Sequence, residues 1–209
     1  MNCRRDAFSL IEMLVVIAII LILAVGLIPA MTSITRAYQL TASTDNLVGG
    51  LMLGRQSALT RGAAVQVRLY KLPDYNQSET TGALMVYRGL QCFVEGDVTV
   101  TNGTNLTTLI PITRPIYFKS PVVVLNDAAR STILSLTNSQ ADLNLPPYNK
   151  NYQFISFRFK PNGQTDLADT ANTLTVVLQN DALVNGGFPL NFRTVRIGSP
   201  SGIVQSYRP

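Results

Sequence analysis

Residues 4–29 read Arg-Arg-Asp-Ala-Phe-Ser-Leu-Ile-Glu-Met-Leu-Val-Val-Ile-Ala-Ile-Ile-Leu-Ile-Leu-Ala-Val-Gly-Leu-Ile-Pro, and this stretch decides the fold. From residue 13 to residue 28 there is no charge and no side-chain hydrogen-bonding group. The hydrocarbon core of a bilayer is about 30 Å thick, and the 23 residues of Phe8–Ala30 extend about 34 Å as a helix. Because only a helix satisfies every backbone N–H and C=O of one segment in lipid, residues 8–31 are predicted to form a transmembrane helix.

The charges before this segment predict its orientation. Arg4 and Arg5 flank its N-terminal side, and positive flanks stay in the cytoplasm. We therefore expect a single-pass protein of the cytoplasmic (inner) membrane. Its N-terminus would be cytoplasmic, and the chain after Met31 would lie in the periplasm or outside the cell.

Glu12 is the one carboxylate in the apolar segment. A charge inside the membrane costs on the order of 2.5–3.5 kcal/mol on insertion scales, and less near a helix end. One interpretation is an interfacial charge that headgroup water tolerates. The other begins with a cut between Ala7 and Phe8, which would create an α-ammonium on Phe8, one helical turn from Glu12. In an assembly of such helices, Glu12 of one copy could pair with the amine of a neighbour, and a buried charge needs such a partner.

The same residues resemble the prepilin processing and methylation motif of type IV pilins and type II secretion pseudopilins. In that family a short basic leader ends in Gly or Ala, an aromatic residue starts the mature chain, and Glu is the fifth mature residue. Ala7, Phe8 and Glu12 match these places, and Pro29 matches a proline that often kinks pilin-like helices. The resemblance implies cleavage after Ala7 by a prepilin peptidase, N-methylation of Phe8, and a role for Glu12 in setting register during assembly. The departure is Ala rather than the commoner Gly before the cut.

Two later segments resemble the minor pseudopilin class known by the letter H. They are Gly-Arg-Gln-Ser-Ala-Leu-Thr-Arg-Gly-Ala-Ala-Val-Gln-Val-Arg-Leu at 54–69 and Phe-Arg-Phe-Lys-Pro-Asn-Gly-Gln-Thr at 157–165. The overall layout, including the ending Gly-Ile-Val-Gln-Ser-Tyr-Arg-Pro, also resembles the pilin-like Verru_Chthon cassette protein D family.

Two other targeting signals share features with this N-terminal segment. A secretory signal peptide has an apolar region of about 7–15 residues and a small-x-small cleavage site. The apolar run here is longer, and Ile28-Pro29-Ala30 is a poor cleavage site. A twin-arginine signal would use Arg4-Arg5, but the phenylalanine is displaced by one position.

Composition argues against catalysis. The 209 residues have a formal charge of +5 and contain no histidine, which removes His-based triads and most zinc sites. The basic residues are scattered singly, so no nucleic-acid groove is expected. No enzyme activity and no cofactor are predicted. Glu95 and Asp97 fit either a calcium site or a solvated turn, and we expect the solvated turn.

The two cysteines are expected to stay apart. Cys3 lies in the proposed leader of residues 1–7 and would be lost on cleavage. Cys92 would then be alone and is expected to be a small buried hydrophobe.

Residues 32–62 are predicted to continue the helix in amphipathic form. Apolar positions recur at steps of three and four, with Arg36, Gln39, Ser43, Asn46 and Ser57 on the opposite side. The glycines at 49, 50 and 54 mark either a break or a close approach of backbone to sheet, and Gly62 is a plausible stop.

After Gly62 the hydrophobic period changes to two, which indicates strands. Val65, Val67 and Leu69 alternate with Gln66, Arg68 and Tyr70, so the first strand is expected to be half-buried, with the second set in solvent. We expect an extracytoplasmic β-rich domain over 63–209, with a hairpin at Asn102-Gly103 and a short helix capped by Asp127 between Asp127 and Leu136. The predicted strands are 65–70, 84–94, 98–101, 104–109, 116–118, 122–125, 154–159, 174–178, 192–197 and 203–207.

The expected fold class is therefore α+β: a long N-terminal helix, half membrane-spanning and half amphipathic, packed on a C-terminal antiparallel β-rich domain. Two functions remain open. The first is a pilin-like structural subunit, expected to be a minor subunit of the filament, with prepilin peptidase, other pilin or pseudopilin subunits and the inner membrane as partners. The second is a permanently anchored extracytoplasmic β-domain that acts as a binding module.

Overall fold

A computed structural model of the chain describes residues 9–75, 84–101, 104–137, 139–140, 145, 152–182, 189 and 191–208. Within these ranges the side chains of 24–30, 99–101, 104–106 and 139–140 are not described. The chain divides into two compact units, Met1–Tyr38 and Gln39–Pro209. Helix α1, Leu10–Arg61, contributes its first part to one unit and its second part to the other.

The second unit contains one antiparallel sheet of ten strands in the order β10-β9-β8-β5-β2-β1-β7-β6, with β3 and β4 also paired to β2. Two short helices, the 3₁₀ helix η1 (Thr132–Ser135) and α2 (Gln179–Ala182), lie between strands along the chain. The strands are β1 Val65–Pro73, β2 Met85–Thr101, β3 Thr104–Pro111, β4 Ile116–Tyr117, β5 Val122–Val124, β6 Ser139–Gln140, β7 Gln153–Phe159, β8 Asn172–Leu178, β9 Phe192–Ile197 and β10 Val204–Tyr207.

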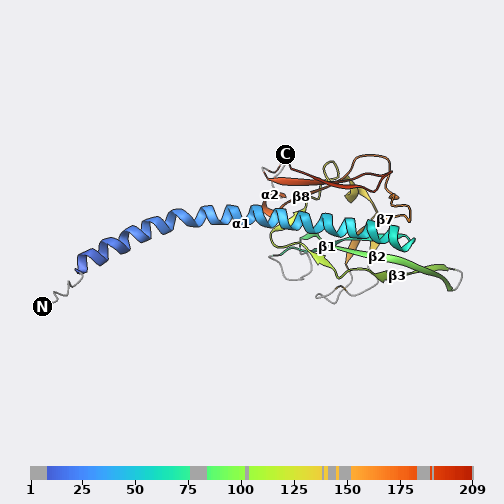
Figure 1. Ribbon diagram of the computed structural model, residues 1–209, viewed down its shortest axis with the longest axis horizontal. Coiled ribbons are helices and arrows are strands. Elements are labelled where there is room, and N and C mark those ends of the chain that lie inside the picture. The colour runs from blue at the N-terminus through green and yellow to red at the C-terminus, as the bar shows by residue number, and fades with distance from the viewer. Residues whose placement is uncertain are drawn as a thin grey trace, which may run out of the picture. The chain divides into compact units, whose positions relative to one another are not determined.

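The predicted α+β class is confirmed. Within the second unit, the part of α1 from Gln39 to Arg61 runs across β1, β2 and β7, as Figure 1 shows. Its buried side chains form one core with the facing side of the sheet, because an apolar stripe at steps of three and four matches the alternate residues of each strand. This core includes Leu40, Leu47, Leu51 and Ala58 from the helix, and Val67, Leu69, Leu90, Cys92, Phe159, Val176 and Val195 from the sheet.

Two glycines bring the helix backbone close to the sheet, which was one of the two interpretations open from the sequence. A Cβ on Gly50 would lie 2.6 Å from Leu90 Cδ2, and one on Gly54 would lie 3.2 Å from Cys92 Sγ. The Cys92 thiol donates a hydrogen bond to the Gly50 carbonyl at 3.5 Å. Gly49 faces open space, and the helix continues through all three glycines to Arg61. Gly62, at φ +61°, ends it as predicted.

The polar side of this helix was predicted too broadly. Ser43 is 1% exposed and Ser57 is 8% exposed, although both were placed opposite the apolar stripe. Each lies seven residues, or two helical turns, from Gly50, so all three share one face. That face approaches the sheet closely, and the small serine side chains fit where larger ones would not.

The outer face of the sheet is also covered, so the expectation of half-buried strands was wrong for β1. Arg68 is 4% exposed and Tyr70 is 0% exposed. The Arg68 guanidinium lies over the Phe93 ring at 4.8 Å and over the Phe154 ring at 4.3 Å, and its Nε donates to Gln66 Oε1 at 2.8 Å. A second apolar cluster on this face contains Tyr70, Leu72, Leu145, Tyr152 and Phe154.

The hairpins follow the predicted pattern. The register pairs Thr101 with Thr104, as a two-residue turn requires, although Asn102-Gly103 itself lies outside the described residues. β9 and β10 form the predicted closing hairpin. The strand predicted to end at residue 70 is longer in the structure, because β1 continues to Pro73 in register with β2.

The segment after β5 differs from the predicted helix. Only Thr132–Ser135 form a 3₁₀ turn, and its cap residue is Ser131, without a side-chain cap hydrogen bond. Asp127 instead accepts the Ala129 N–H at 2.9 Å and pairs with Arg130 at 3.5 Å. An Asx turn of this kind offers the backbone an alternative to a helix.

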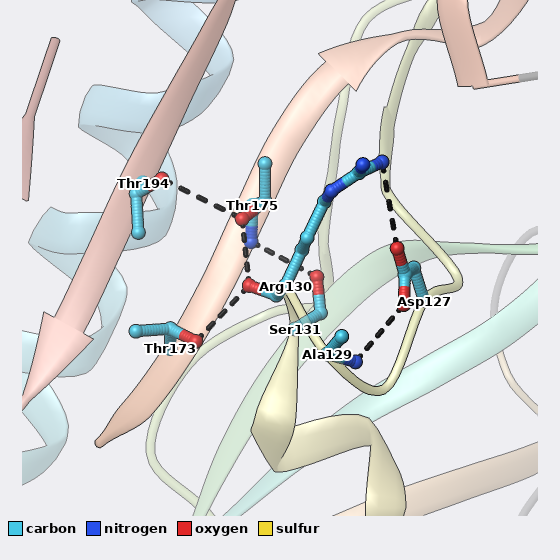
Figure 2. A network of polar contacts seen from close by, with 7 residues as sticks. All are labelled: Asp127, Ala129, Arg130, Ser131, Thr173, Thr175 and Thr194. Atoms are coloured by element: carbon cyan, nitrogen blue, oxygen red, sulfur yellow. Dashed lines mark hydrogen bonds and ion pairs between the residues drawn. The ribbon is translucent and has the colours of Figure 1, made fainter. Parts of the chain in front are cut away.

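A polar network fastens this segment to β8 (Figure 2). The Arg130 carbonyl accepts the Thr173 hydroxyl at 3.0 Å and the Thr175 hydroxyl at 2.7 Å. The Thr175 N–H donates to Ser131 Oγ at 3.0 Å. Ser131 is fully buried. Its hydroxyl therefore takes the place of a carbonyl from a neighbouring strand as the acceptor for the Thr175 N–H of β8.

Near its C-terminal end, α1 is joined to two distant turns. Arg55 Nε donates to the Gly163 carbonyl at 3.3 Å and to the Ser201 carbonyl at 3.2 Å. Gly163 and Gly202 have φ values of +79° and +61°, so both turns need a residue without a Cβ. A Cβ on Gly202 would collide with the Gly163 carbonyl oxygen.

A matched pair of alanine substitutions tests the close approach of helix to sheet. Gly49→Ala should stabilise the fold by about 0.5–1 kcal/mol through helix propensity alone. Gly50→Ala gains the same propensity but pushes on Leu90, which is 1% exposed in the core, so it should be less stable than Gly49→Ala by about 1–3 kcal/mol. Urea unfolding of the full chain measures both, and equal stabilities would contradict the close packing.

Candidate functional site: the N-terminal helix

The first turn of α1 places Glu12 at the start of the helix. The Ser9 carbonyl accepts the N–H of Glu12 at 3.1 Å and that of Met13 at 3.3 Å, and the helix begins at Leu10. Glu12 is exposed. A carboxylate in a first turn interacts favourably with the partial positive charge of the free backbone N–H groups.

The predicted processing residues lie outside this description. Arg4, Arg5, Ala7 and Phe8 are not among the described residues, and the side chain of Pro29 is not described either. The helix α1 continues through position 29, and the kink expected there stays a prediction.

The first part of α1 exposes apolar side chains in every direction. Between residues 10 and 23, the exposed fractions of the large apolar side chains run from 45% at Val16 to 85% at Leu10. An ordinary surface helix has one apolar stripe and one polar face, whereas a helix that is apolar all round is covered by other apolar groups. The residues with such exposure are Leu10, Ile11, Met13, Leu14, Val15, Val16, Ile17, Ile19, Ile20, Leu21, Ile22 and Leu23.

Within the ranges that the structure describes, no helix is both long enough and apolar enough to cross a membrane. The predicted transmembrane segment of residues 8–31 includes Phe8 and the side chains of 24–30, which lie outside the described set, and it stays a prediction.

The acidic residues considered for calcium do not gather into a site. Glu95 pairs with Arg158 Nε at 2.6 Å and is mostly buried, whereas Asp97 is exposed. The carboxylate of Asp166 accepts the Arg158 N–H at 2.7 Å. Among the described residues, no group of three or more His, Cys, Asp or Glu side chains could hold a metal ion.

Cys92 is buried and has no disulfide, as predicted. Burial raises the pKa of its thiol from 9.0 to about 12. Since the thiolate is the reactive form, this thiol is not a nucleophile near neutral pH. Gly50 and Gly54 have no side chains, so the Cys92 thiol fills the space between the helix backbone and the sheet.

Several buried polar residues of the second unit were not predicted, and Arg68 and Gln179 are two of them. Arg68 alternates with apolar residues along β1, so the pattern placed it in solvent. Gln179 directly follows the buried β8 residues and is 4% exposed. Its position at the end of an apolar run was the only feature of the sequence that indicated the burial of Gln179.

The thiol of Cys92 gives a test by chemical labelling. At pH 8 a pKa of about 12 leaves about one molecule in ten thousand as thiolate. Iodoacetamide should therefore leave Cys92 unlabelled in the folded chain over hours and label it fully in 8 M urea, read by peptide mass spectrometry. Fast labelling of the folded chain would contradict its burial beneath α1.

Comparison with known proteins gives one match in sequence and two in structure. Residues 2–28 match the model of the prokaryotic N-terminal methylation motif. No curated protein matches the chain in sequence.

Both structural matches have low sequence identity. The crystal structure of the type IV minor pilin FimU of Pseudomonas aeruginosa (strain PAO1) has 15% identity and a TM-score of 0.47, covering 84% of this chain and 96% of that one. The minor pseudopilin EpsH of the type 2 secretion system of Vibrio cholerae has 13% identity and a TM-score of 0.41, covering 82% and 98%. The finer resemblances, to the H class and to the cassette protein D family, stay predictions. The chain carries, at residues 2–28, the prokaryotic N-terminal methylation motif that its resemblance to prepilins predicted.

Proposed function

We propose that the chain is a pilin-like structural subunit, processed at its N-terminus and assembled through its N-terminal helix into a type IV pilus or a type II secretion pseudopilus. The observation that carries this proposal is the methylation motif at residues 2–28 leading into a helix that is apolar on every side from Leu10 to Leu23. Such a helix needs an apolar environment, which the membrane supplies before assembly and neighbouring helices supply afterwards.

The processing step would remove residues 1–7. Prepilin peptidase hydrolyses the peptide bond between Ala7 and Phe8, and a methyl group is then added to the new amine of Phe8. Arg4 and Arg5 hold the leader on the cytoplasmic side of the inner membrane. The folded domain after the helix lies in the periplasm or outside the cell.

Glu12 would set the register between neighbouring helices. Its position in the first turn of α1 places it one turn after the new N-terminus. In a packed bundle, the carboxylate of one copy meets the amine of another, and the pair offsets the cost of burying either charge. Pro29 would bend the helix within the membrane-spanning segment.

The proposed role is structural and not enzymatic. Among the described residues, the thiol of Cys92 is buried and protonated, Glu95 pairs with Arg158, and Asp97 is exposed. The folded domain would therefore act through its surface, as a minor subunit among other pilin or pseudopilin subunits.

The mature N-terminus decides between this subunit and a permanently anchored binding module. Mass spectrometry of the native protein should find a chain that starts at N-methylated Phe8. An Ala7→Glu variant should keep its leader, because the peptidase site needs a small residue, and it should stay in the membrane. Native material that still begins with Met1 would contradict processing and favour the anchored module.

A substitution at Glu12 tests assembly separately from processing. Glu12→Ala should be inserted and cleaved normally, yet its incorporation into filaments should fall by between about a hundredfold and a few thousandfold, because removing one partner of a buried pair costs about 3–5 kcal/mol. Glu12→Gln should behave in the same way, since it lacks the charge. Asp97→Ala removes an exposed carboxylate elsewhere and is the matched control. Normal incorporation of Glu12→Ala, measured by immunoblotting of sheared filaments, would contradict the role of Glu12.

A further inference from the structure

A small hollow of about 220 Å³ lies in the second unit, beside the place where β2 and β5 meet. The two strands pair only at Tyr87 and Val124. The residues on either side, Met85 and Val86 on β2 and Val123 and Val124 on β5, line the hollow. Helix α2 contributes Gln179 and Ala182 to the same lining.

One of the residues that line this hollow, Gln179, carries a polar atom without a partner. Gln179 is 4% exposed, and its backbone N–H donates to the Pro121 carbonyl at 2.7 Å. Its side-chain oxygen Oε1 is fully buried and accepts no hydrogen bond from any residue that the structure describes. An unsatisfied buried acceptor costs free energy, so a ligand that supplies a donor gains what the folded chain lacks.

The hollow is open at its mouth and closed at its floor. Leu84, at the rim, is 41% exposed, whereas Val123 and Val124 are 1% and 2% exposed. None of the lining residues carries a charge. A ligand here is therefore neutral and mostly apolar, because a charged group would lose its hydration without gaining a counter-charge.

The size of the hollow restricts the ligand to one ring system. An engineered cavity of about 150 Å³ binds benzene, and sites for drug-sized molecules begin at about 300 Å³. The 220 Å³ here lie between these values. Buried phenol and indole groups combine a large apolar area with a single polar hydrogen that seeks a partner.

We propose that this hollow binds one neutral aromatic ring that carries a hydrogen-bond donor, a phenol or an indole, whose O–H or N–H donates to Gln179 Oε1. The ring occupies the hollow that Met85, Val123 and Ala182 line. This binding site is independent of filament assembly, which uses the N-terminal helix.

A larger groove elsewhere on the same unit lacks this signal. It measures about 460 Å³ and is lined by Met52, Leu53 and Ile203 among others. Its guanidinium, from Arg55, already donates to two carbonyls. None of the described residues that line this groove carries a buried polar atom without a partner.

The methionine methyl groups provide the test. We would label them with ¹³C in the full chain, held in lipid nanodiscs, and titrate with p-cresol and with toluene, which has the same ring without the donor. With p-cresol, the Met85 methyl signal should shift and saturate, while the Met52 signal in the other groove should not move. Toluene should bind about two- to tenfold more weakly, the range expected for one hydrogen bond.

Two variants separate the hydrogen bond from the cavity. Gln179→Leu removes the acceptor, so p-cresol should lose its advantage over toluene. Ala182→Phe fills the hollow from the rim and should abolish both shifts, and an unchanged thermal unfolding midpoint shows that the fold is intact. Equal binding of p-cresol and toluene by the wild-type chain, or no shift of Met85 with either, would overturn the proposal.

A third ligand distinguishes the source of the ring. N-acetyltyrosinamide carries the same phenol on a peptide backbone. If it shifts Met85 as p-cresol does, the site accepts a tyrosine side chain of another protein. If only p-cresol does so, the site is for free small molecules.

Discussion

The close approach of helix α1 to the sheet is the contact on which the second unit depends. At Gly50 and Gly54 the helix backbone lies directly over the side chains of Leu90 and Cys92. This short distance lets the small residues on the same face, Ser43 and Ser57, become buried without leaving voids. It also explains why a cysteine is accommodated at position 92, since its thiol is small and can donate to the Gly50 carbonyl.

Much of the fold could be predicted from local patterns. The stop of the helix at Gly62 depends on a residue that tolerates a positive φ. The Asn-Gly sequence predicted the two-residue turn that the pairing of Thr101 with Thr104 requires. The closing hairpin of β9 and β10 follows from alternation and a turn sequence. Each of these signals depends on residues that are close together in the sequence, so it can be recognised before the fold is known.

The errors came from contacts between distant segments. Arg68 and Tyr70 alternate with apolar residues and were placed in solvent, but aromatic rings from β2 and β7 cover them. Asp127 was expected to cap a helix, whereas its turn is held by threonines of β8 more than forty residues later in the sequence. For the N-terminal site, residue identities and spacing indicated the motif that residues 2–28 match. The proposed pairing of Glu12 with an amine is a contact between two copies, so the fold of a single chain does not contain it.

The double hydrogen bond from Arg55 has a mechanical consequence for a subunit that is pulled by its helix. Arg55 ties the end of α1 to carbonyls of residues 163 and 201, one in the turn after β7 and the other in the turn between β9 and β10. Tension along the helix axis is therefore shared between two parts of the sheet that are far apart in sequence.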